Sequence, residues 1–205
     1  EMGQKAVAIT DHGVMYGVVD FYKECKKQGI KPIIGCEVYV APRTRHDKQH
    51  GLDNRPYHLV LLCKNETGYQ NLIKMVSLAY IEGFYSRPRI DRELLEQHSE
   101  GLIALSACLA GEVPRALERN NYEQAKEVAL YYQSVFGEGN YYLELQNHGI
   151  EEQIHILPFM ENAQLLERWK GTGSEEVVEA TLSSLHCPSS GTQEENSNSY
   201  AANCG

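Results

Sequence analysis

The chain has 205 residues, of which 42% are hydrophobic and 23% charged, an ordinary balance for one globular domain with or without a tail. No segment approaches the roughly 18 consecutive apolar residues of a membrane-spanning helix, and no charged-then-apolar leader supports secretion. The formal net charge of −9 argues against a broad electrostatic clamp for DNA formed by this chain alone. Six cysteines show neither a CxxC pair nor zinc-finger spacing, so we expect reduced thiols and a cytoplasmic location.

Apolar runs and helical spacing alternate along the first three quarters of the chain. Strands are predicted at residues 6–10, 31–40, 58–62, 102–106 and 141–145. Helices are predicted at residues 14–28, 66–80, 112–119 and 122–136, with a shorter one that Asp91 caps and that runs to Gln97. Residues 41–57 and 81–90 are predicted to be loops. This alternation predicts an α/β fold of parallel βα units, arranged as an open sheet or a barrel.

The last quarter of the chain differs from the rest in composition. Residues 154–205 hold two basic groups, Arg168 and Lys170, against seven acidic ones. A helix is conceivable at 165–185, but the strand–helix alternation stops, and the remainder is polar with little to bury. We therefore divide the chain into a body, residues 1–153, and a tail of uncertain structure that is either out of frame or disordered.

Metal-binding residue types follow or open the predicted strands. Asp11 and His12 come directly after the first strand, and Glu37 lies within the second. His58 opens the third strand, and Cys108 lies just beyond the fourth. Carboxylate, imidazole and thiolate are the groups that bind zinc, manganese or iron. Parallel strands in register would bring these five side chains to one edge of the sheet. Two or three metal ions bridged by a carboxylate would there activate water and bind a phosphate.

Each of these residues also has an ordinary structural interpretation. In that interpretation Asp11 caps the following helix, and His58 is a core histidine whose hydrogen bonds are satisfied. Cys108 is then a small buried hydrophobic residue. Glu37 is the least ordinary, because a carboxylate in an apolar strand needs a partner. Spacing alone leaves the metal site and the structural interpretation open, and it singles out no catalytic base.

Two further residues are candidates for contact with a phosphate or substrate. Arg87 and Arg89 flank Pro88, which stiffens them, and we select Arg89 as the phosphate contact, with pairing to surface acids as the alternative. His148 follows the fifth strand in an Asn-His-Gly loop, a position suited to function and equally to a turn. The sequence has no Gly-rich P-loop and no GxSxG elbow, which argues against nucleotide-dependent kinases and α/β-hydrolases.

At the level of longer blocks, the body resembles a known family. The blocks are residues 10–17 (TDHGVMYG), 29–39 (GIKPIIGCEVY), 57–62 (YHLVLL), 83–91 (GFYSRPRID), 106–112 (SACLAGE) and 142–146 (YLELQ). Together they resemble the polymerase-and-histidinol-phosphatase (PHP) domain, in the form found in the alpha subunit of bacterial DNA polymerase III. The resemblance covers about residues 3–153. It implies a distorted (β/α)7 barrel, of which this chain would form a part, followed by a tail that does not match.

The resemblance also implies a metal centre. The family uses nine ligands at the mouth of the barrel, and five of their positions fall on Asp11, His12, Glu37, His58 and Cys108, each of a ligand type. The ions would be Zn, Mn or Fe. The family's His-x-His and Asp-x-His motifs do not occur in this sequence. We therefore expect a piece cut at both ends, its reading frame lost near Gln153, which translating the other two frames would test.

The function that the resemblance implies is that of a longer parent protein. The parent would be a DNA-directed DNA polymerase, a nucleotidyltransferase of DNA replication that takes DNA and deoxynucleoside triphosphates and uses Mg in a palm domain outside this sequence. Its partners would include a sliding clamp and a proofreading subunit. A complete PHP site would be a metal-dependent phosphodiesterase of the 3′→5′ exonuclease type, whereas this piece would be inactive. The alternatives are a free-standing phosphoesterase acting on a small phosphomonoester, and a non-catalytic scaffold.

Overall fold

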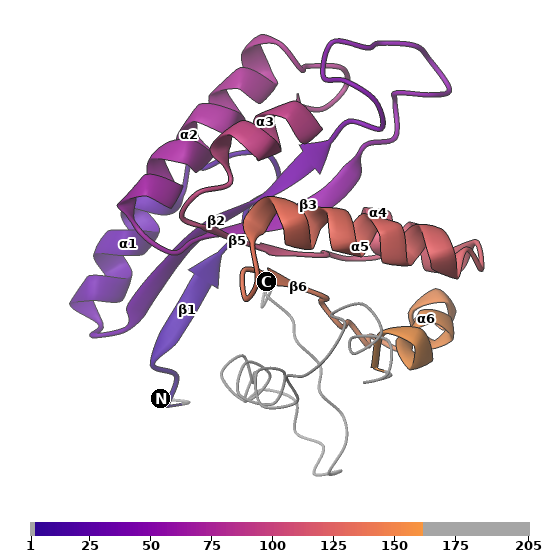
Figure 1. The fold of residues 1–205 in the computed structure, drawn as a ribbon. Helices are drawn as coiled ribbons and strands as arrows, with labels where there is room; N and C mark the ends of the chain where they lie inside the picture. The colour runs from indigo at the N-terminus through magenta and orange to yellow at the C-terminus, as the bar shows by residue number, and fades with distance from the viewer. Residues whose placement is uncertain (1–2, 162–205) are drawn as a thin grey trace.

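The computed structural model describes residues 3–161 (Figure 1). Its elements, in chain order, are β1 (Ala6–Ile9), α1 (Val18–Lys27), β2 (Lys31–Val40), β3 (Tyr57–Cys63), α2 (Glu66–Ile81), β4 (Arg89–Ile90), α3 (Arg92–His98), β5 (Leu102–Leu105), α4 (Glu112–Glu118), α5 (Tyr122–Phe136), β6 (Tyr141–Tyr142) and α6 (Glu151–Glu161). None of these helices is long and apolar enough to cross a membrane. The division at residue 153 stays a prediction, because residues 162–205 lie outside the described part of the chain.

Most of the predicted elements are confirmed to within a few residues. β2 and α5 have the predicted bounds, and Asp91 caps α3 by accepting a hydrogen bond from the Leu94 amide at 3.2 Å. β6 is shorter than predicted, and the pattern did not predict β4 or α6. α1 begins four residues later than predicted because the preceding turn stays bonded to β2. There the Glu37 amide donates to the Asp11 carbonyl at 3.0 Å, and the Gly13 amide donates to the Glu37 carbonyl at 2.8 Å.

The strands form one open mixed sheet in the order β1-β2-β3-β5-β6, with β4 also paired to β2. β1 and β4 run parallel to β2, and β6 runs parallel to β5. The expectation of parallel units throughout was wrong at β3, which is antiparallel to both β2 and β5. A parallel neighbour needs a crossover, usually helical, whereas β2 and β3 are joined by residues 41–56, which contain no helix.

The two faces of the sheet have different roles. Alternate residues of β2, namely Cys36, Val38 and Val40, are buried in the main hydrophobic core, together with apolar side chains from α2, α3, α4, α5 and α6. Figure 1 shows α2 and α3 side by side along the sheet. Because side chains alternate along a strand, Glu37 and Tyr39 lie on the opposite face. That face positions the functional side chains.

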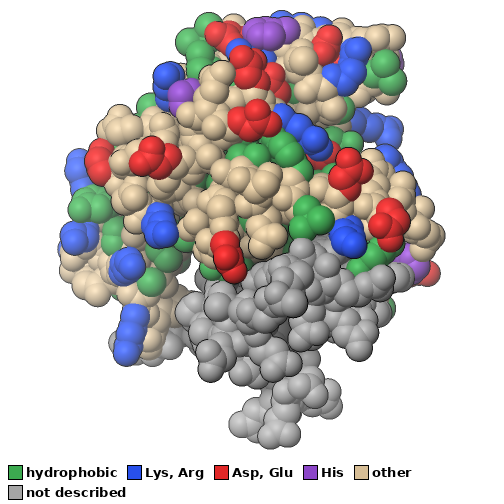
Figure 2. Space-filling model, in the orientation of Figure 1, with side chains coloured by type: hydrophobic (Ala, Val, Ile, Leu, Met, Phe, Trp, Pro, Cys, Tyr) green, Lys and Arg blue, Asp and Glu red, His purple; other side chains and the backbone are tan. Residues whose placement is uncertain are grey.

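Charged side chains of both signs are mixed on the surface. Figure 2 shows acidic and basic side chains interspersed on one face of the molecule. Several arginines are engaged in ion pairs, such as Arg45 with Glu82 and Arg92 with Glu112.

Candidate metal centre

Glu37 is the middle of a cluster of three donor side chains. Its Oε1 atom lies 2.7 Å from Nδ1 of His12 and 2.7 Å from Nδ1 of His58. The donor atoms of all three residues lie within 4.8 Å of one another. Glu37 is buried, whereas the imidazole of His12 is exposed, so the cluster has one open side. Two imidazoles around a shared carboxylate oxygen are a suitable donor set for a transition-metal ion.

The antiparallel course of β3 explains why His58 reaches this cluster. His58 is the second residue of β3, and the pairing places it directly opposite Tyr39, near the carboxyl end of β2. Since Glu37 lies two residues from Tyr39 on the same face, His58 is its diagonal neighbour across the strands. A parallel β3 would have placed its first residues at the other end of the sheet. The strand direction that the sequence pattern missed is therefore what brings this histidine into the site.

His12 reaches Glu37 through a tight turn after β1. Gly13 has a φ of 69°, in the left-handed region that glycine adopts without strain. A Cβ at this position would lie 2.9 Å from Cε2 of Tyr39 and 3.0 Å from Cγ of Pro88. The turn therefore requires glycine for its backbone conformation and for the close approach of two neighbouring side chains.

Cys108 adjoins the ring nitrogen of His58 that faces Glu37. Its Sγ is 3.5 Å from Nδ1 of His58. The loop after β5 is held there by the His58 amide, which donates to the carbonyl of Ala110 at 3.1 Å. Ala107 adopts a φ of 60°, which is uncommon for a residue with a side chain. The thiol is thus positioned by a constrained turn, and its role as a fourth donor stays a prediction.

The electrostatics of the cluster favour a charged pair in the absence of a metal. Burial opposes ionisation of Glu37, but hydrogen bonding to His58 and the charges of the two histidines hold its pKa below the usual value. Burial likewise opposes protonation of His58, but Cys108 and Glu37 outweigh it and raise its pKa to about 9. An ion entering this site would have to displace the proton that His58 shares with Glu37.

Asp11 is beside the cluster but not within it. Its backbone carbonyl accepts from the Glu37 amide, and the Cys36 thiol donates to the same carbonyl at 3.3 Å. Its carboxylate turns towards α1, with Oδ2 at 3.4 Å from the position of a Cβ on Gly17. In the described residues the structure therefore brings His12, Glu37 and His58 together, with Cys108 adjoining. The carboxylate of Asp11 stays outside the group.

The pattern did not single out Glu144, a second buried carboxylate near the cluster. It follows β6, is 7% exposed, and lines a small pocket with Cys108, Gln146 and Gln153. Its Oε1 accepts from Gln146 at 2.7 Å, whereas Oε2 has no hydrogen-bond partner among the described residues. Burial, with the nearby charge of Glu37, raises its pKa to about 7. The signal that marked Glu37, an acid within an apolar run, is also present here in Leu-Glu-Leu.

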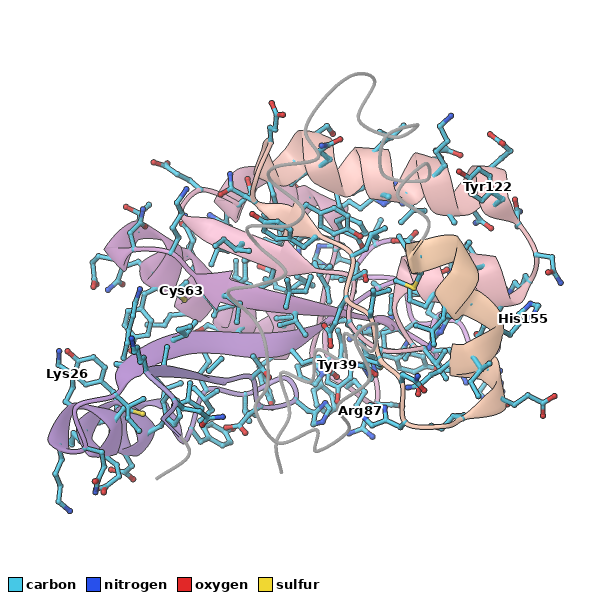
Figure 3. All side chains as sticks on the ribbon, turned by 90° about the horizontal axis from the view of Figure 1, so that it is seen from below. Lys26, Tyr39, Cys63, Arg87, Tyr122 and His155 are labelled. Atoms are coloured by element: carbon cyan, nitrogen blue, oxygen red, sulfur yellow. The ribbon has the colours of Figure 1, made fainter. Side chains whose placement is uncertain are left out.

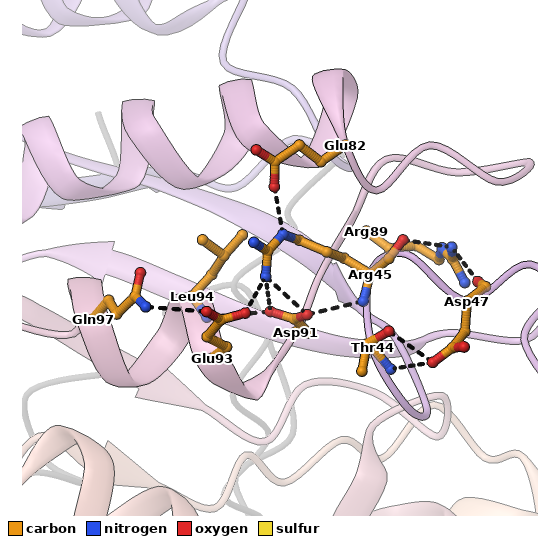
Figure 4. Close-up of polar contacts among 9 residues, drawn as sticks. All are labelled: Thr44, Arg45, Asp47, Glu82, Arg89, Asp91, Glu93, Leu94 and Gln97. Atoms are coloured by element: carbon orange, nitrogen blue, oxygen red, sulfur yellow. Dashed lines mark hydrogen bonds and ion pairs between the residues drawn. The ribbon is translucent and has the colours of Figure 1, made fainter.

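Arg89 is fully buried in the structure. Its guanidinium donates to four backbone carbonyls, those of Gly83, Arg45, Asp47 and Asp53. Figure 4 shows part of this arrangement, next to the ion pairs of Arg45 with Glu82, Asp91 and Glu93. Arg89 therefore holds the 41–56 loop against the sheet. This environment favours a structural role over the phosphate contact expected from sequence.

His148 lies at the end of a chain of amide contacts that leads from Glu144. Its amide donates to Oε1 of Gln153 at 2.8 Å, and Nε2 of Gln153 lies 3.5 Å from Oε1 of Gln146. The His148 side chain is exposed and is not part of the donor cluster. Its expected contact with substrate stays a prediction.

Comparison with known proteins agrees with this geometry. The family model described as "PHP domain" matches residues 1–148, and the chain therefore belongs to the PHP domain family. PHP domains are generally metal-dependent, and the donor set around Glu37 fits that property.

Within this family, the chain is similar to curated proteins named DNA polymerase III subunit alpha. It is 51% identical over 160 residues to the one from Treponema pallidum, covering 78% of this chain and 14% of that protein. It is 53% identical over 148 residues to that of Borreliella burgdorferi, covering 72% and 13%. For Thermus aquaticus the identity is 49% over 150 residues, covering 72% and 12%. The chain thus spans about an eighth of the length of these relatives.

Proposed function

We propose that this chain contributes the core of a metal-dependent phosphodiesterase site of the 3′→5′ exonuclease type, within the alpha subunit of a bacterial DNA polymerase III. The observation that supports it is the meeting of two imidazole nitrogens on one buried carboxylate oxygen, each at 2.7 Å. A salt bridge alone needs one partner for Glu37. Two histidines from separate segments, the turn after β1 and strand β3, on the same oxygen are typical of a site built to hold a cation.

The residues that would hold a Zn, Mn or Fe ion are His12, Glu37 and His58, with Cys108 as an adjoining thiolate donor. A bound ion of this kind lowers the pKa of a coordinated water and stabilises the negative charge of a phosphodiester. Glu37 supplies the buried negative charge that attracts the cation. His58 would give up its Nδ1 proton to hold a cation, and the Tyr39 ring, 5.1 Å away and edge-on, keeps the imidazole in place. Asp11 remains a candidate ligand by its match to the family.

The longer protein would be a DNA-directed DNA polymerase of chromosome replication. This proposal is supported by the name of the relatives, since the described residues contain the PHP domain alone. Its substrates would be DNA and deoxynucleoside triphosphates, with Mg at a separate polymerase site outside this sequence. The replicase subunits expected as partners are a sliding clamp and a proofreading subunit, and the expected location is the cytoplasm.

Metal retention and nuclease activity test the proposal separately. The purified chain, loaded with Mn²⁺ or Zn²⁺ and then desalted, should retain metal by elemental analysis. Glu37→Gln should lower the affinity at least about tenfold, while the exposed His50→Ala should not. In the full-length polypeptide that contains this segment, Glu37→Gln should abolish metal-dependent removal of nucleotides from the 3′ end and leave polymerisation intact. A wild-type protein without a bound transition metal and with nuclease activity unchanged by Glu37→Gln would instead favour the non-catalytic scaffold.

A further inference from the structure

The turn that precedes β4 lies directly beside the metal centre. Three segments pair one after another with the same edge of β2. They are β1, then His12, which lies opposite Glu37, and then β4, which begins opposite Tyr39. The residues just before β4 therefore run next to the turn that carries His12. The contact of Pro88 with the Gly13 position, at 3.0 Å, confirms how close these two segments are.

Arg87 is the exposed cation of this turn. Its guanidinium carbon lies 5.6 Å from the centre of the Tyr39 ring, and that ring is 5.1 Å from the ring of His58. Figure 3 shows Tyr39 and Arg87 next to one another, far from Lys26. Arg45 and Arg92 are paired with acids, whereas among the described residues no carboxylate pairs with Arg87. A free, oriented guanidinium one ring away from a cation site is suited to bind a phosphate.

A row of exposed aromatic side chains continues from this arginine. Phe84, 50% exposed, stacks on Tyr80 with ring centres 6.1 Å apart. Tyr16, three residues after Gly13 in the segment that follows the His12 turn, is 82% exposed. Phe84 lies in the turn that carries Arg87, which the Tyr85 amide closes by donating to the Arg87 carbonyl at 3.0 Å. Large rings left in solvent beside a cation are typical of surfaces that bind single-stranded nucleic acid.

From this arrangement we infer that the face formed by Arg87, Tyr16 and Phe84 binds the single-stranded end of a nucleic acid, with Arg87 on a phosphate and the two rings on bases. The inference rests on the proposed function, because the face leads to the metal centre. The bases must be unpaired to stack on the rings, so a duplex is a poorer ligand. We therefore assign the phosphate contact to Arg87, which the fold leaves exposed, in place of Arg89, the residue expected from the sequence.

Binding is tested without catalysis by fluorescence anisotropy, using a short 5′-fluorescein-labelled oligothymidylate and the full chain in EDTA. Arg87→Ala should weaken binding about tenfold and make the log–log dependence on salt shallower by about 0.7, the contribution of one single-strand phosphate. Tyr16→Ala and Phe84→Ala should each weaken binding at least about fivefold without changing that slope. Arg87→Lys should restore the slope.

Lys26→Ala is the matched control. Lys26 also lies over a tyrosine ring, 5.8 Å from the centre of Tyr22, but at the far end of the molecule, and its loss should change the affinity less than about twofold. The inference is overturned if the wild type does not bind, if Arg87→Ala and Lys26→Ala have equal effects, or if a duplex binds as tightly. Failure of the proposed function is seen separately, as absence of retained metal and of nuclease activity while binding still depends on Arg87.

Discussion

The Nδ1 atom of His58 lies 2.7 Å from Oε1 of Glu37, although the strand pairing sets His58 opposite Tyr39. The contact is diagonal across two antiparallel strands, on the face of the sheet opposite the core residues Cys36, Val38 and Val40. It couples a buried acid to a histidine whose proton must leave before a cation binds. The site is therefore expected to respond to pH as well as to metal.

Metal affinity should rise with pH because of His58. Its pKa of about 9 in the metal-free protein means that below this pH each bound ion displaces one proton. The affinity for Mn²⁺ should increase about tenfold per pH unit between about pH 6 and about pH 8. Titration calorimetry in two buffers of different ionisation enthalpy counts the released proton. His58→Ala should lose this dependence and His50→Ala should keep it, whereas a pH-independent wild type would contradict the assignment.

Glu144→Gln should stabilise the metal-free protein at alkaline pH. The carboxyl is expected to bind its proton with a pKa of about 7 when folded and near 4.5 when unfolded. The folded state therefore binds more protons between these values, and stability falls as pH rises from about 4.5 to about 7. The glutamine keeps the acceptor for Gln146 without the buried charge, so it should gain up to about 3 kcal/mol at pH 8 and little at pH 4.

Urea unfolding in EDTA across this pH range measures the difference. Exposed Glu138→Gln is the control and should follow the wild type within about 0.5 kcal/mol at every pH. A parallel pH dependence for wild type and Glu144→Gln would show that Glu144 is not the buried acid described.

Gly13→Ala should disturb both stability and the metal site. The left-handed backbone at φ 69° costs a residue with a side chain about 1–2 kcal/mol, and contact with Tyr39 and Pro88 adds to it, for a total of about 3 kcal/mol. Gly29, with a φ of 71° and open space where its Cβ would lie, isolates the backbone contribution. Gly29→Ala should lose about 1 kcal/mol and keep its metal affinity. Equal losses in the two variants would refute the steric argument.

Replacing Arg89 by lysine should lower the free energy of unfolding far more than replacing Arg87 by lysine. Arg89→Lys leaves several buried carbonyls without a donor and should cost about 3–5 kcal/mol, with faster proteolysis of the 41–56 loop. Exposed Arg87→Lys should change the free energy of unfolding by less than about 0.5 kcal/mol. Similar stabilities for the two variants would mean that Arg89 does not hold the loop.

Much of the candidate site was predictable from residue types at the ends of strands. An acid inside an apolar strand identified Glu37, and the Asp-His pair after β1 identified His12. Glu144 carried the same signal within a shorter apolar run and was missed. The burial of Arg89 could not be predicted, because it depends on carbonyls contributed by residues 45–53 and 83, and its phosphate contact stays a prediction.

The amino-acid sequence by itself determined the local elements, the cap of α3 and the donor types, because these depend on periodicity and on side chains close in the chain. Membership of the PHP family followed from the similarity of whole blocks of sequence to that family. Only the tertiary structure decided the direction of β3, and with it the meeting of His58 with Glu37. An alternation of period two is the same whether the neighbouring strand runs parallel or antiparallel. Which charged side chains stay in solvent is likewise set by contacts between distant segments.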